Sequence, residues 1–198
     1  MADILDTYND QIYANITNKC NCRCTFCIRF LSNGLGDAET LWHKVNPTLD
    51  EVKATMDKFD FSGYKWLVFC GYGEPTCELG VLLEAARYAK EKYHLKIHLN
   101  TNGLGSLENG HDIVPELSEV LDAVSISLNA PNAELYNNVT RPTLPGAFEA
   151  MLSFTEECGK SIPDVQMTIV DVLPLEQQEQ CRKLAQKLGV RLRIRHYS

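Results

Sequence analysis

Three cysteines, spaced C-x3-C-x2-C, are the residues of this sequence best suited to chemistry. Cys20, Cys24 and Cys27 lie within eight residues, in a polar stretch that follows a strand-like run. A structural zinc ion takes four protein ligands, and an ordinary four-iron cluster takes four thiolates. Three thiolates on one loop would leave one iron without a protein ligand. An open coordination position of this kind indicates a site that does chemistry rather than one that only stabilises a fold.

A fourth cysteine in the same stretch, Cys22, leaves other interpretations open. With it the loop could form a four-cysteine zinc or electron-transfer site, although four ligands in eight residues would need a tightly coiled loop. Plain buried cysteines fit less well, because Asn21, Arg23 and Thr25 make the stretch polar. The N-terminus shows no secretory signal, so we expect a cytoplasmic, reduced protein without disulfides. We expect Cys22 not to be a ligand.

The composition indicates one globular domain over residues 1–198. Hydrophobic residues make up 44% of the chain and charged residues 23%, as in ordinary folded proteins. No run approaches the roughly 18 apolar residues needed to cross a bilayer. The net charge of -7 argues against general nucleic-acid binding, since phosphate recognition needs a basic face. The other cysteines are too scattered to predict a second cluster: Cys70, Cys77, Cys158 and Cys181.

Six strand-like runs alternate with helical segments along the chain. The expected strands span residues 11–17, 65–70, 94–100, 124–129, 165–170 and 190–196. The expected helices span residues 47–59, 78–93, 113–121, 133–138, 146–158 and 175–188. This alternation predicts a parallel sheet with right-handed crossovers.

Four of the expected strands have one apolar and one polar face. The polar positions are Tyr13, Asn15 and Thr17; His98 and Asn100; Ser125, Ser127 and Asn129; and Arg191, Arg193 and Arg195. A doubly wound sheet would instead bury both faces of its central strands. A curved sheet whose polar face lines a cavity predicts an α/β fold, a partial (β/α)6 barrel with helices outside and its site at the carboxyl ends of the strands. For the last strand, an exposed edge protected by charges explains the arginines equally well.

Two connections carry further signals. The segment Gly71-Tyr72-Gly73-Glu74-Pro75 follows the second expected strand, and its glycines permit close backbone approach to a ligand. Residues 18–30 form the expected cluster loop. Residues 31–46 are irregular and long for a connector, and they form either a lid or a merely mobile loop.

The cysteine spacing, with Phe26 before the last cysteine, resembles the cluster motif of the radical S-adenosylmethionine (SAM) superfamily. The order of the other motifs resembles the core of the same fold over almost the whole chain. This resemblance implies that Cys20, Cys24 and Cys27 ligate a [4Fe-4S] cluster whose open iron binds SAM. It further implies cofactor contacts from Phe26, Gly71, Tyr72, Gly73, Glu74, Pro75, Asn100, Ser127 and Asn129.

The activity implied by the resemblance is reductive cleavage of SAM to a 5'-deoxyadenosyl radical, which abstracts hydrogen from a substrate. The expected electron donor is an external protein such as flavodoxin or ferredoxin. Candidate substrate contacts on the polar face and its loops are Asn15, His98, Asn102, Arg193 and Arg195. Inward-facing arginines would favour an anionic substrate. An activating enzyme of the glycyl-radical type, acting on a protein partner, and a non-enzymatic iron-sulfur redox or sensor protein are the alternatives.

At finer grain the sequence is similar to the TatD-associated radical SAM proteins. The segments that carry this similarity are residues 15–18, 69–76, 100–103, 125–130 and 193–195. The resemblance implies a TatD-type metal-dependent nuclease as a functional partner.

Overall fold

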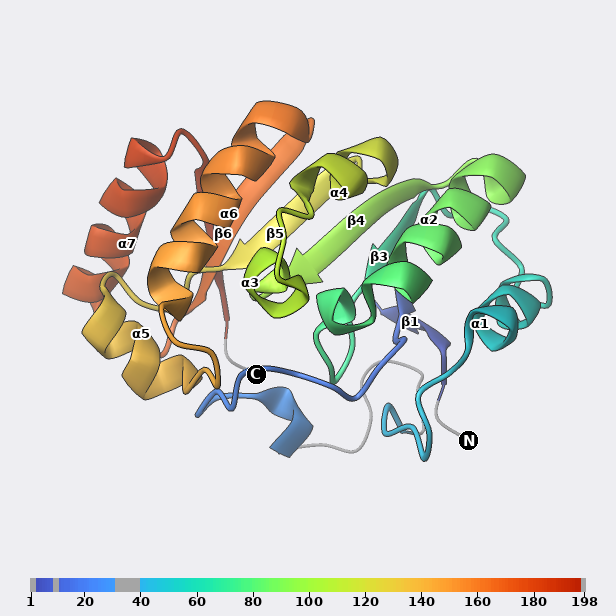
Figure 1. Ribbon diagram of the computed structural model, residues 1–198, viewed down its shortest axis with the longest axis horizontal. Helices are drawn as coiled ribbons and strands as arrows, with labels where there is room; N and C mark the ends of the chain where they lie inside the picture. The colour runs from blue at the N-terminus through green and yellow to red at the C-terminus, as the bar shows by residue number, and fades with distance from the viewer. Residues whose placement is uncertain (1–2, 9–10, 31–39, 197–198) are drawn as a thin grey trace.

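A seven-stranded sheet forms the centre of the computed structural model, which describes residues 3–8, 11–30 and 40–196 (Figure 1). The strands are β1 (Leu5–Tyr8), β2 (Gln11–Ala14), β3 (Trp66–Phe69), β4 (Lys96–Thr101), β5 (Ala123–Ser127), β6 (Asp164–Val170) and β7 (Arg191–Arg195). They lie side by side in sequence order. Strands β2 to β7 are parallel, and β1 pairs antiparallel with β2. The order of the strands never reverses, whereas the strand order of a doubly wound sheet must reverse at one point.

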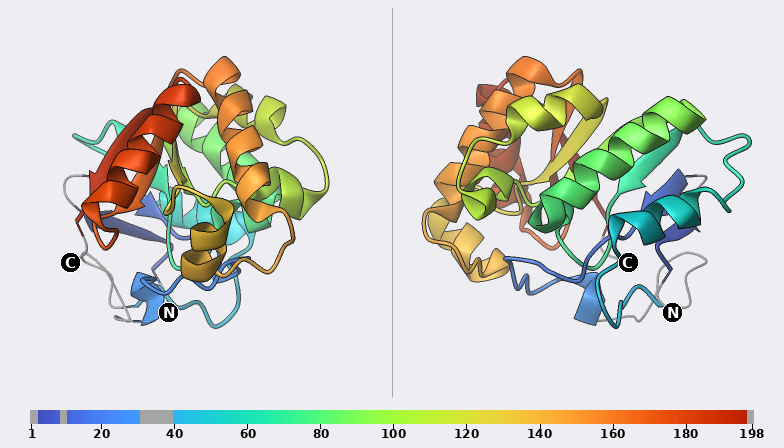
Figure 2. Two further views of the ribbon diagram at one scale, coloured as in Figure 1. Left: turned by 90° about the vertical axis from the view of Figure 1, so that its left-hand side faces the viewer. Right: turned by 45° about the vertical axis from the view of Figure 1, so that its right-hand side comes forward.

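The helices cover one face of this sheet (Figure 2). They are α1 (Leu49–Met56), α2 (Leu79–Tyr93), α3 (Gly105–Asn109), α4 (Val114–Val120), α5 (Ala133–Thr140), α6 (Ala147–Ser161) and α7 (Leu175–Lys187), with 3-10 turns η1 (Ile28–Phe30) and η2 (Pro75–Glu78). The arrangement confirms the predicted partial barrel of parallel strands with outer helices. No helix among the described residues is both long and apolar enough to span a membrane.

Strand β1 and helix α3 were not predicted. The β1 segment, Leu-Asp-Thr-Tyr, is only four residues long and lacks a clear alternation of apolar residues. Pairing of Leu5 with Ala14 and of Tyr8 with Gln11 supplies the hydrogen bonds that make it a strand. Helix α3 is five residues long and begins at Gly105, a poor helix former. Both elements depend on tertiary contacts that local propensity does not report.

The core lies between the sheet and the helices. Alternate strand residues such as Ile12, Leu99, Ile126 and Met167 are fully buried there. The predicted alternation therefore assigns the faces correctly, and the polar residues lie on the side away from the helices. On β7, Leu192 and Ile194 pack against the core, while the arginines alternate with them.

Strand β7 is also an edge of the sheet, because β6 is its one neighbour. Both explanations offered for its arginines thus apply: they lie on the inner face of the barrel, and they lie on an edge strand.

Helix α1 begins as the sequence predicts. The Thr48 side chain accepts a hydrogen bond from the Glu51 amide at 3.3 Å, and the Glu51 carboxylate accepts one from the Thr48 amide at 2.8 Å. A reciprocal cap of this kind stabilises a helix by about 1 kcal/mol. It places the start of α1 directly after the segment that ends at Pro47.

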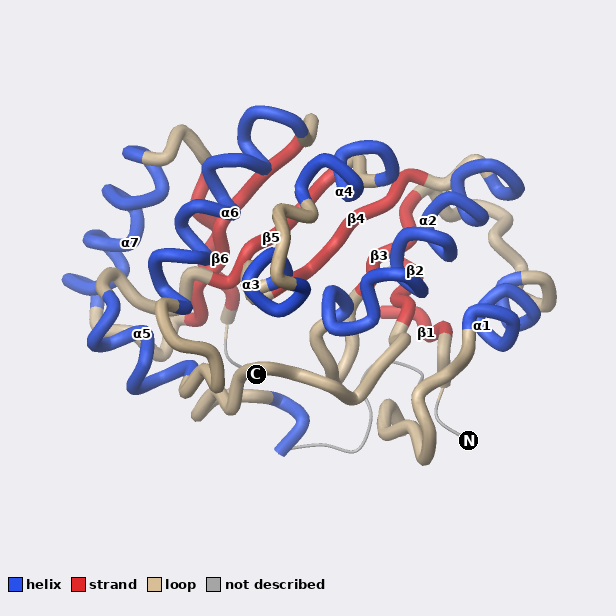
Figure 3. The backbone as a smooth tube through the Cα atoms, viewed as in Figure 1, coloured by secondary structure: helices blue, strands red, loops and turns tan. Residues whose placement is uncertain are grey.

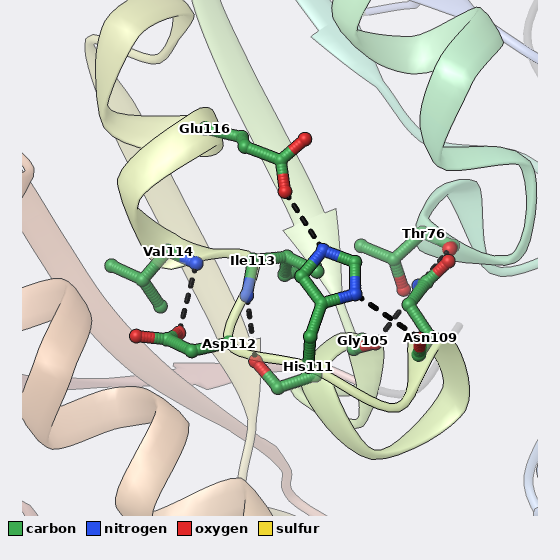
Figure 4. Close-up of polar contacts among 9 residues, drawn as sticks. Thr76, Gly105, Asn109, His111, Asp112, Ile113, Val114 and Glu116 are labelled. Carbon is green, nitrogen blue, oxygen red and sulfur yellow. Dashed lines mark hydrogen bonds and ion pairs between the residues drawn. The ribbon is translucent and has the colours of Figure 1, made fainter.

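Polar side chains on the outer side fix the connection between α3 and α4 (Figure 4). Asn109 donates to the carbonyl of Thr76 at 3.0 Å, and the His111 ring bonds to Glu116 at 2.8 Å. The Glu116 carboxylate raises the pKa of His111. These contacts tie the loop that follows β4 to the segment that follows β3, which helps to position both at the same end of the barrel.

Candidate active site

The cysteine loop crosses the carboxyl ends of the strands, from β2 on one side towards α5 on the other (Figure 3). Backbone hydrogen bonds attach it at the far side: the Arg23 amide donates to Thr140 at 2.9 Å, and the Thr143 amide donates to Asn21 at 2.9 Å. The loop therefore lies across the mouth of the barrel, where enzymes of barrel architecture place their active sites.

The four cysteines of this loop do not share one environment. Cys22 is 6% exposed and belongs to the hydrophobic core, whereas Cys20, Cys24 and Cys27 are partly exposed. Burial raises the pKa of Cys20 to about 12 and raises that of Cys27, while a hydrogen bond with Cys22 lowers the pKa of Cys24. Iron binding would replace the thiol protons.

No three His, Cys, Asp or Glu side chains within residues 3–8, 11–30 and 40–196 are arranged to hold one metal ion. A four-iron cluster makes a different demand, because each thiolate binds a separate iron.

Glu74 is a buried carboxylate that joins three segments of the barrel mouth. It is 4% exposed, and its oxygens accept hydrogen bonds from the Thr76 and Thr101 hydroxyls at 2.8 and 2.7 Å and from the Asn102 amide at 2.7 Å. Its own backbone amide donates to the Lys19 carbonyl at 2.7 Å. Burial raises the pKa of Glu74, against the effect of these donors. The Glu74 carboxylate thus holds the 71–75 segment against the end of β4, and its backbone amide holds the segment against the cysteine loop.

Both glycines of the 71–75 segment lie where a side chain would collide. A Cβ at Gly73 would lie 2.7 Å from the Lys19 carbonyl oxygen and still closer to that of Thr17. A Cβ at Gly71 would overlap the Asn15 amide. Tyr72 and Pro75 are buried. The backbone of this segment therefore packs directly on the end of β2 and the start of the cysteine loop.

Three predicted cofactor contacts lie at or near the carboxyl ends of β4 and β5. Asn100 lies beside Ser125 in the register of β4 and β5, and its side chain hydrogen-bonds Cys70. Ser127 is half-buried at the end of β5. Asn129 has a left-handed backbone (φ 58°) and is 5% exposed, yet its buried Oδ1 has no hydrogen-bond partner among the described residues. A buried acceptor left without a partner is costly in the absence of a ligand.

Two predicted substrate contacts make hydrogen bonds within the protein. The Asn15 side chain is 2% exposed; its amide NH2 donates to the Leu41 carbonyl at 2.8 Å, and its Oδ1 has no hydrogen-bond partner among the described residues. The Asn102 side chain donates to Asn21 at 2.6 Å and accepts from the Leu104 amide at 2.9 Å. Both side chains therefore help to attach neighbouring segments at the barrel mouth, and substrate contact by them stays a prediction.

Residues 40–46 of the expected lid are attached to the end of β2. The Asn18 side chain donates to the His43 carbonyl at 2.6 Å, the His43 ring bonds to the Asn15 carbonyl at 2.9 Å, and Asn46 donates to Thr17 at 2.9 Å. This part of the segment is a fixed support of the site. Residues 31–39, the remainder of the expected lid, lie outside the described residues.

The predicted cofactor contact Phe26 is partly exposed on the cysteine loop.

The remaining candidates lie on the inner face of the barrel. His98 is half-buried, and its ring bonds to the Ser125 hydroxyl at 2.8 Å. Burial lowers the pKa of His98, and the Arg193 guanidinium adds to this effect, although the Asp164 carboxylate opposes it. Arg195 is close enough to interact electrostatically with Cys24 and Cys70. Arg195 therefore lies near the cysteine loop, while Arg193 lies near Tyr13 and His98 on the inner face.

Sequence reasoning missed several residues that position the site. Asn21 is 5% exposed and binds Asn102, and the Gln166 side chain donates to the Ser125 hydroxyl at 2.8 Å. Asn21 lies within the cysteine loop and Gln166 on the polar face of an expected strand. Their partners come from other strands, which no local pattern identifies.

A cavity of about 580 Å³ opens on the outer side of the barrel, between the α3–α4 connection and α6. Its lining includes His111, Asp112, Phe154 and Glu157. Its lining contains none of the predicted site residues.

The fold and the site together define a partial (β/α) barrel with a three-cysteine loop across its mouth. The sequence model of the Radical SAM superfamily matches residues 14–188, and the chain belongs to this superfamily.

Two relatives and one solved structure illustrate the relationship. The GTP 3',8-cyclase of Clostridium perfringens (strain SM101) is 29% identical over 164 residues, which are 81% of this chain and 46% of that protein. A candidate glycyl-radical enzyme activating enzyme of Methanocaldococcus jannaschii is 30% identical over 113 residues, or 55% of this chain and 39% of that protein. The chain thus spans less than half the length of these relatives.

The structure of Streptococcus suis SuiB bound to S-adenosylmethionine has the same fold. Its TM-score is 0.62 at 15% identity, over 94% of this chain and 38% of that chain.

Radical SAM proteins use a [4Fe-4S] cluster and SAM. The described residues fit these groups. Three partly exposed thiols share one loop at the barrel mouth, and the amide oxygen of Asn129 is buried without a partner.

Proposed function

We propose that this chain is a radical SAM enzyme in which Cys20, Cys24 and Cys27 hold the cluster and the substrate is a small anionic molecule. The observation that carries the proposal is the division of the cysteine loop. Three thiols are partly exposed at the barrel mouth, while Cys22 is buried, and its thiol bonds to Cys24 and Asn102. This division favours three ligands and one open iron over four protein ligands.

Bound together, the cluster and SAM supply one-electron cleavage of SAM to a 5'-deoxyadenosyl radical that can take a hydrogen atom from a substrate. The protein binds and orients these groups. Residues 71–75 would hold the SAM amino group, Ser127 and Asn129 its ribose and carboxylate, and Phe26 would approach the adenine. Asn100 would face the same cavity. These roles are consistent with the positions of all the residues around the barrel mouth.

The anionic character of the substrate is inferred from Arg193 and Arg195. Both side chains lie on the inner face, and neither forms an ion pair with a described residue, whereas the neighbouring Arg191 pairs with Asp164. Two adjacent unpaired guanidinium groups repel each other unless an anion binds, and planar guanidinium suits carboxylate and phosphate. The cyclase relative is named for GTP, which is an anion, and this name also supports an anionic substrate.

Replacing Arg193 and Arg195 with glutamine should weaken substrate binding. Loss of a hydrogen bond to a charged group costs about 1.5–3 kcal/mol, so we expect KM to rise roughly tenfold or more per arginine. The assay would follow deuterium transfer into 5'-deoxyadenosine from the anion-exchange-retained fraction of a deuterated cell extract. Arg191→Gln is the matched control, because the Arg191 guanidinium already pairs with Asp164. Equal KM values in all three proteins would exclude these arginines as the anion site.

The activity itself is tested with anaerobically reconstituted protein, SAM and dithionite. We expect 5'-deoxyadenosine and methionine to form in equal amounts. A non-enzymatic redox or sensor protein would change its cluster spectrum without consuming SAM. A reconstituted cluster that leaves SAM intact under reducing conditions would refute the proposed activity.

A second candidate function is activation of a protein partner. The observation in its favour is the 30% identity to the candidate glycyl-radical enzyme activating enzyme of M. jannaschii. Size fractionation of the deuterated extract separates the two functions. Deuterium from the macromolecular fraction would favour a protein substrate, and deuterium from the small-molecule fraction would favour the anionic one.

We further propose membership of the TatD-associated subgroup, with a TatD-type nuclease as functional partner and a flavodoxin or ferredoxin as electron donor. The support is the sequence resemblance of residues 15–18, 69–76, 100–103, 125–130 and 193–195.

A further inference from the structure

Arg29 lies just beyond the last cysteine of the loop and is held from three sides. Its guanidinium lies over the Trp42 ring, 4.9 Å from the ring centroid, and 5.5 Å from the centroid of Phe30. Its Nη1 donates to the Tyr72 carbonyl at 3.3 Å. Cation–π stacking and a hydrogen bond together restrict a side chain that would otherwise move freely.

The aromatic support is itself packed. Trp42 contacts Tyr72 edge-to-face with ring centroids 5.0 Å apart, and Tyr72 is 3% exposed. Arg29 thus joins three parts of the site: the cysteine loop, the 71–75 segment and the attached segment 40–46. Its planar group is better suited than a lysine to stack and donate at the same time.

Arg29 lies beside an expected cluster ligand. It follows Cys27 by two residues, and its backbone amide hydrogen-bonds the Cys27 thiol. The Arg29 Nε is buried and has no hydrogen-bond partner among the described residues. A buried donor without a partner, so close to an expected thiolate ligand, indicates that an acceptor bound at the loop completes its hydrogen bonding.

We propose that Arg29 is a positioning residue that favours the reduced state of the bound cluster. The inference rests on the proposed function, because it assumes that the three cysteines ligate a cluster. Reduction adds one electron, supplied by an external donor, and makes the cluster and its thiolates more negative by one charge. A fixed guanidinium beside the thiolates stabilises the more negative state more strongly, since net charge and hydrogen bonds at the sulfurs set the potential of such clusters.

The test is a redox titration of the full chain, reconstituted anaerobically and poised with dithionite and mediators at one fixed potential. The EPR signal of the reduced cluster, normalised to iron and sulfide content, gives the ratio of reduced to oxidised protein. For Arg29→Gln we expect this ratio to fall about tenfold, which corresponds to about 59 mV for a one-electron couple. Arg29→Lys keeps the charge and should stay within about threefold of the wild type.

Arg23→Gln is the matched control, because Arg23 lies in the same loop but its side chain is exposed. Its ratio should equal that of the wild type. An unchanged ratio in Arg29→Gln with normal iron content would overturn the proposal, and so would a tenfold fall in Arg29→Lys. If Arg29→Gln does not hold a cluster, the reduced-to-oxidised ratio of Arg29→Lys tests the proposal. Loss of the cluster from both variants would indicate a role in cluster assembly and would also overturn the proposal. Absence of a cluster from the wild-type protein would instead refute the proposed function.

Discussion

Replacing Cys24 with alanine is expected to abolish cleavage of SAM. Cys24 is the central residue of the three partly exposed cysteines, and its pKa is lowered, which favours the thiolate that iron requires. Changes to residues that only support metal ligands cost about 10–100-fold, so loss of a ligand should reduce 5'-deoxyadenosine formation by more than about 100-fold. Liquid chromatography of anaerobic reaction mixtures measures the product, and iron analysis measures the cluster.

Cys22→Ala is the control for this experiment. The Cys22 side chain is 6% exposed and packs in the core, so its loss should leave a small cavity and cost about 1 kcal/mol of stability. Cluster content and SAM cleavage should remain near wild type. Undiminished product from Cys24→Ala would refute the three-cysteine assignment, and loss of the cluster from Cys22→Ala would restore the four-ligand alternative.

Replacing Gly73 with alanine is expected to destabilise the protein and to prevent cluster assembly. The added Cβ would meet the carbonyl oxygens of Thr17 and Lys19, which are backbone atoms and cannot rotate away. Overpacking typically costs about 1–3 kcal/mol, and here relief would require movement of the loop that carries Cys20. Urea denaturation of the cluster-free protein measures the first effect, and iron bound after reconstitution measures the second.

Gly80→Ala is the matched control for Gly73→Ala. Gly80 lies in the first turn of α2, where an added Cβ meets no atom within 4 Å. Alanine is the better helix former, so this variant should be as stable as the wild type or more stable by up to about 1 kcal/mol. If Gly73→Ala matched Gly80→Ala in stability and iron content, close packing of residues 71–75 on the cysteine loop would not be required.

Much of the fold could be predicted because its strands repeat a simple physical pattern. Residues such as Leu99 and Ile126 must be covered by helices, while His98 and Ser125 on the alternate positions must face elsewhere. The edge strand β1 escaped prediction because its stability comes from pairing with β2 rather than from its own residues. The sequence of a four-residue segment does not indicate with which strand its backbone will pair.

In the candidate site, too, local features could be predicted from the sequence, whereas contacts between distant segments could not. The cysteine spacing and the glycines at 71 and 73 are local, so the sequence indicates a cluster loop and a close-packed turn without further information. Asn15 and Asn102 looked like substrate contacts because they lie near strand ends. The structure adds their partners: the Asn15 NH2 donates to Leu41, and Asn102 bonds to Asn21 and Leu104.

The sequence by itself determined that the chain carries three spaced thiols on one loop and a sheet with one polar face, because spacing and alternation are properties of neighbouring residues. Only the tertiary structure decided which groups meet across the barrel mouth. It buried Cys22, placed Arg29 over Trp42 and left the Asn129 amide oxygen without a hydrogen-bond partner among the described residues. Those outcomes depend on segments far apart in the chain, and the direction of a side chain is set by the atoms that pack around it.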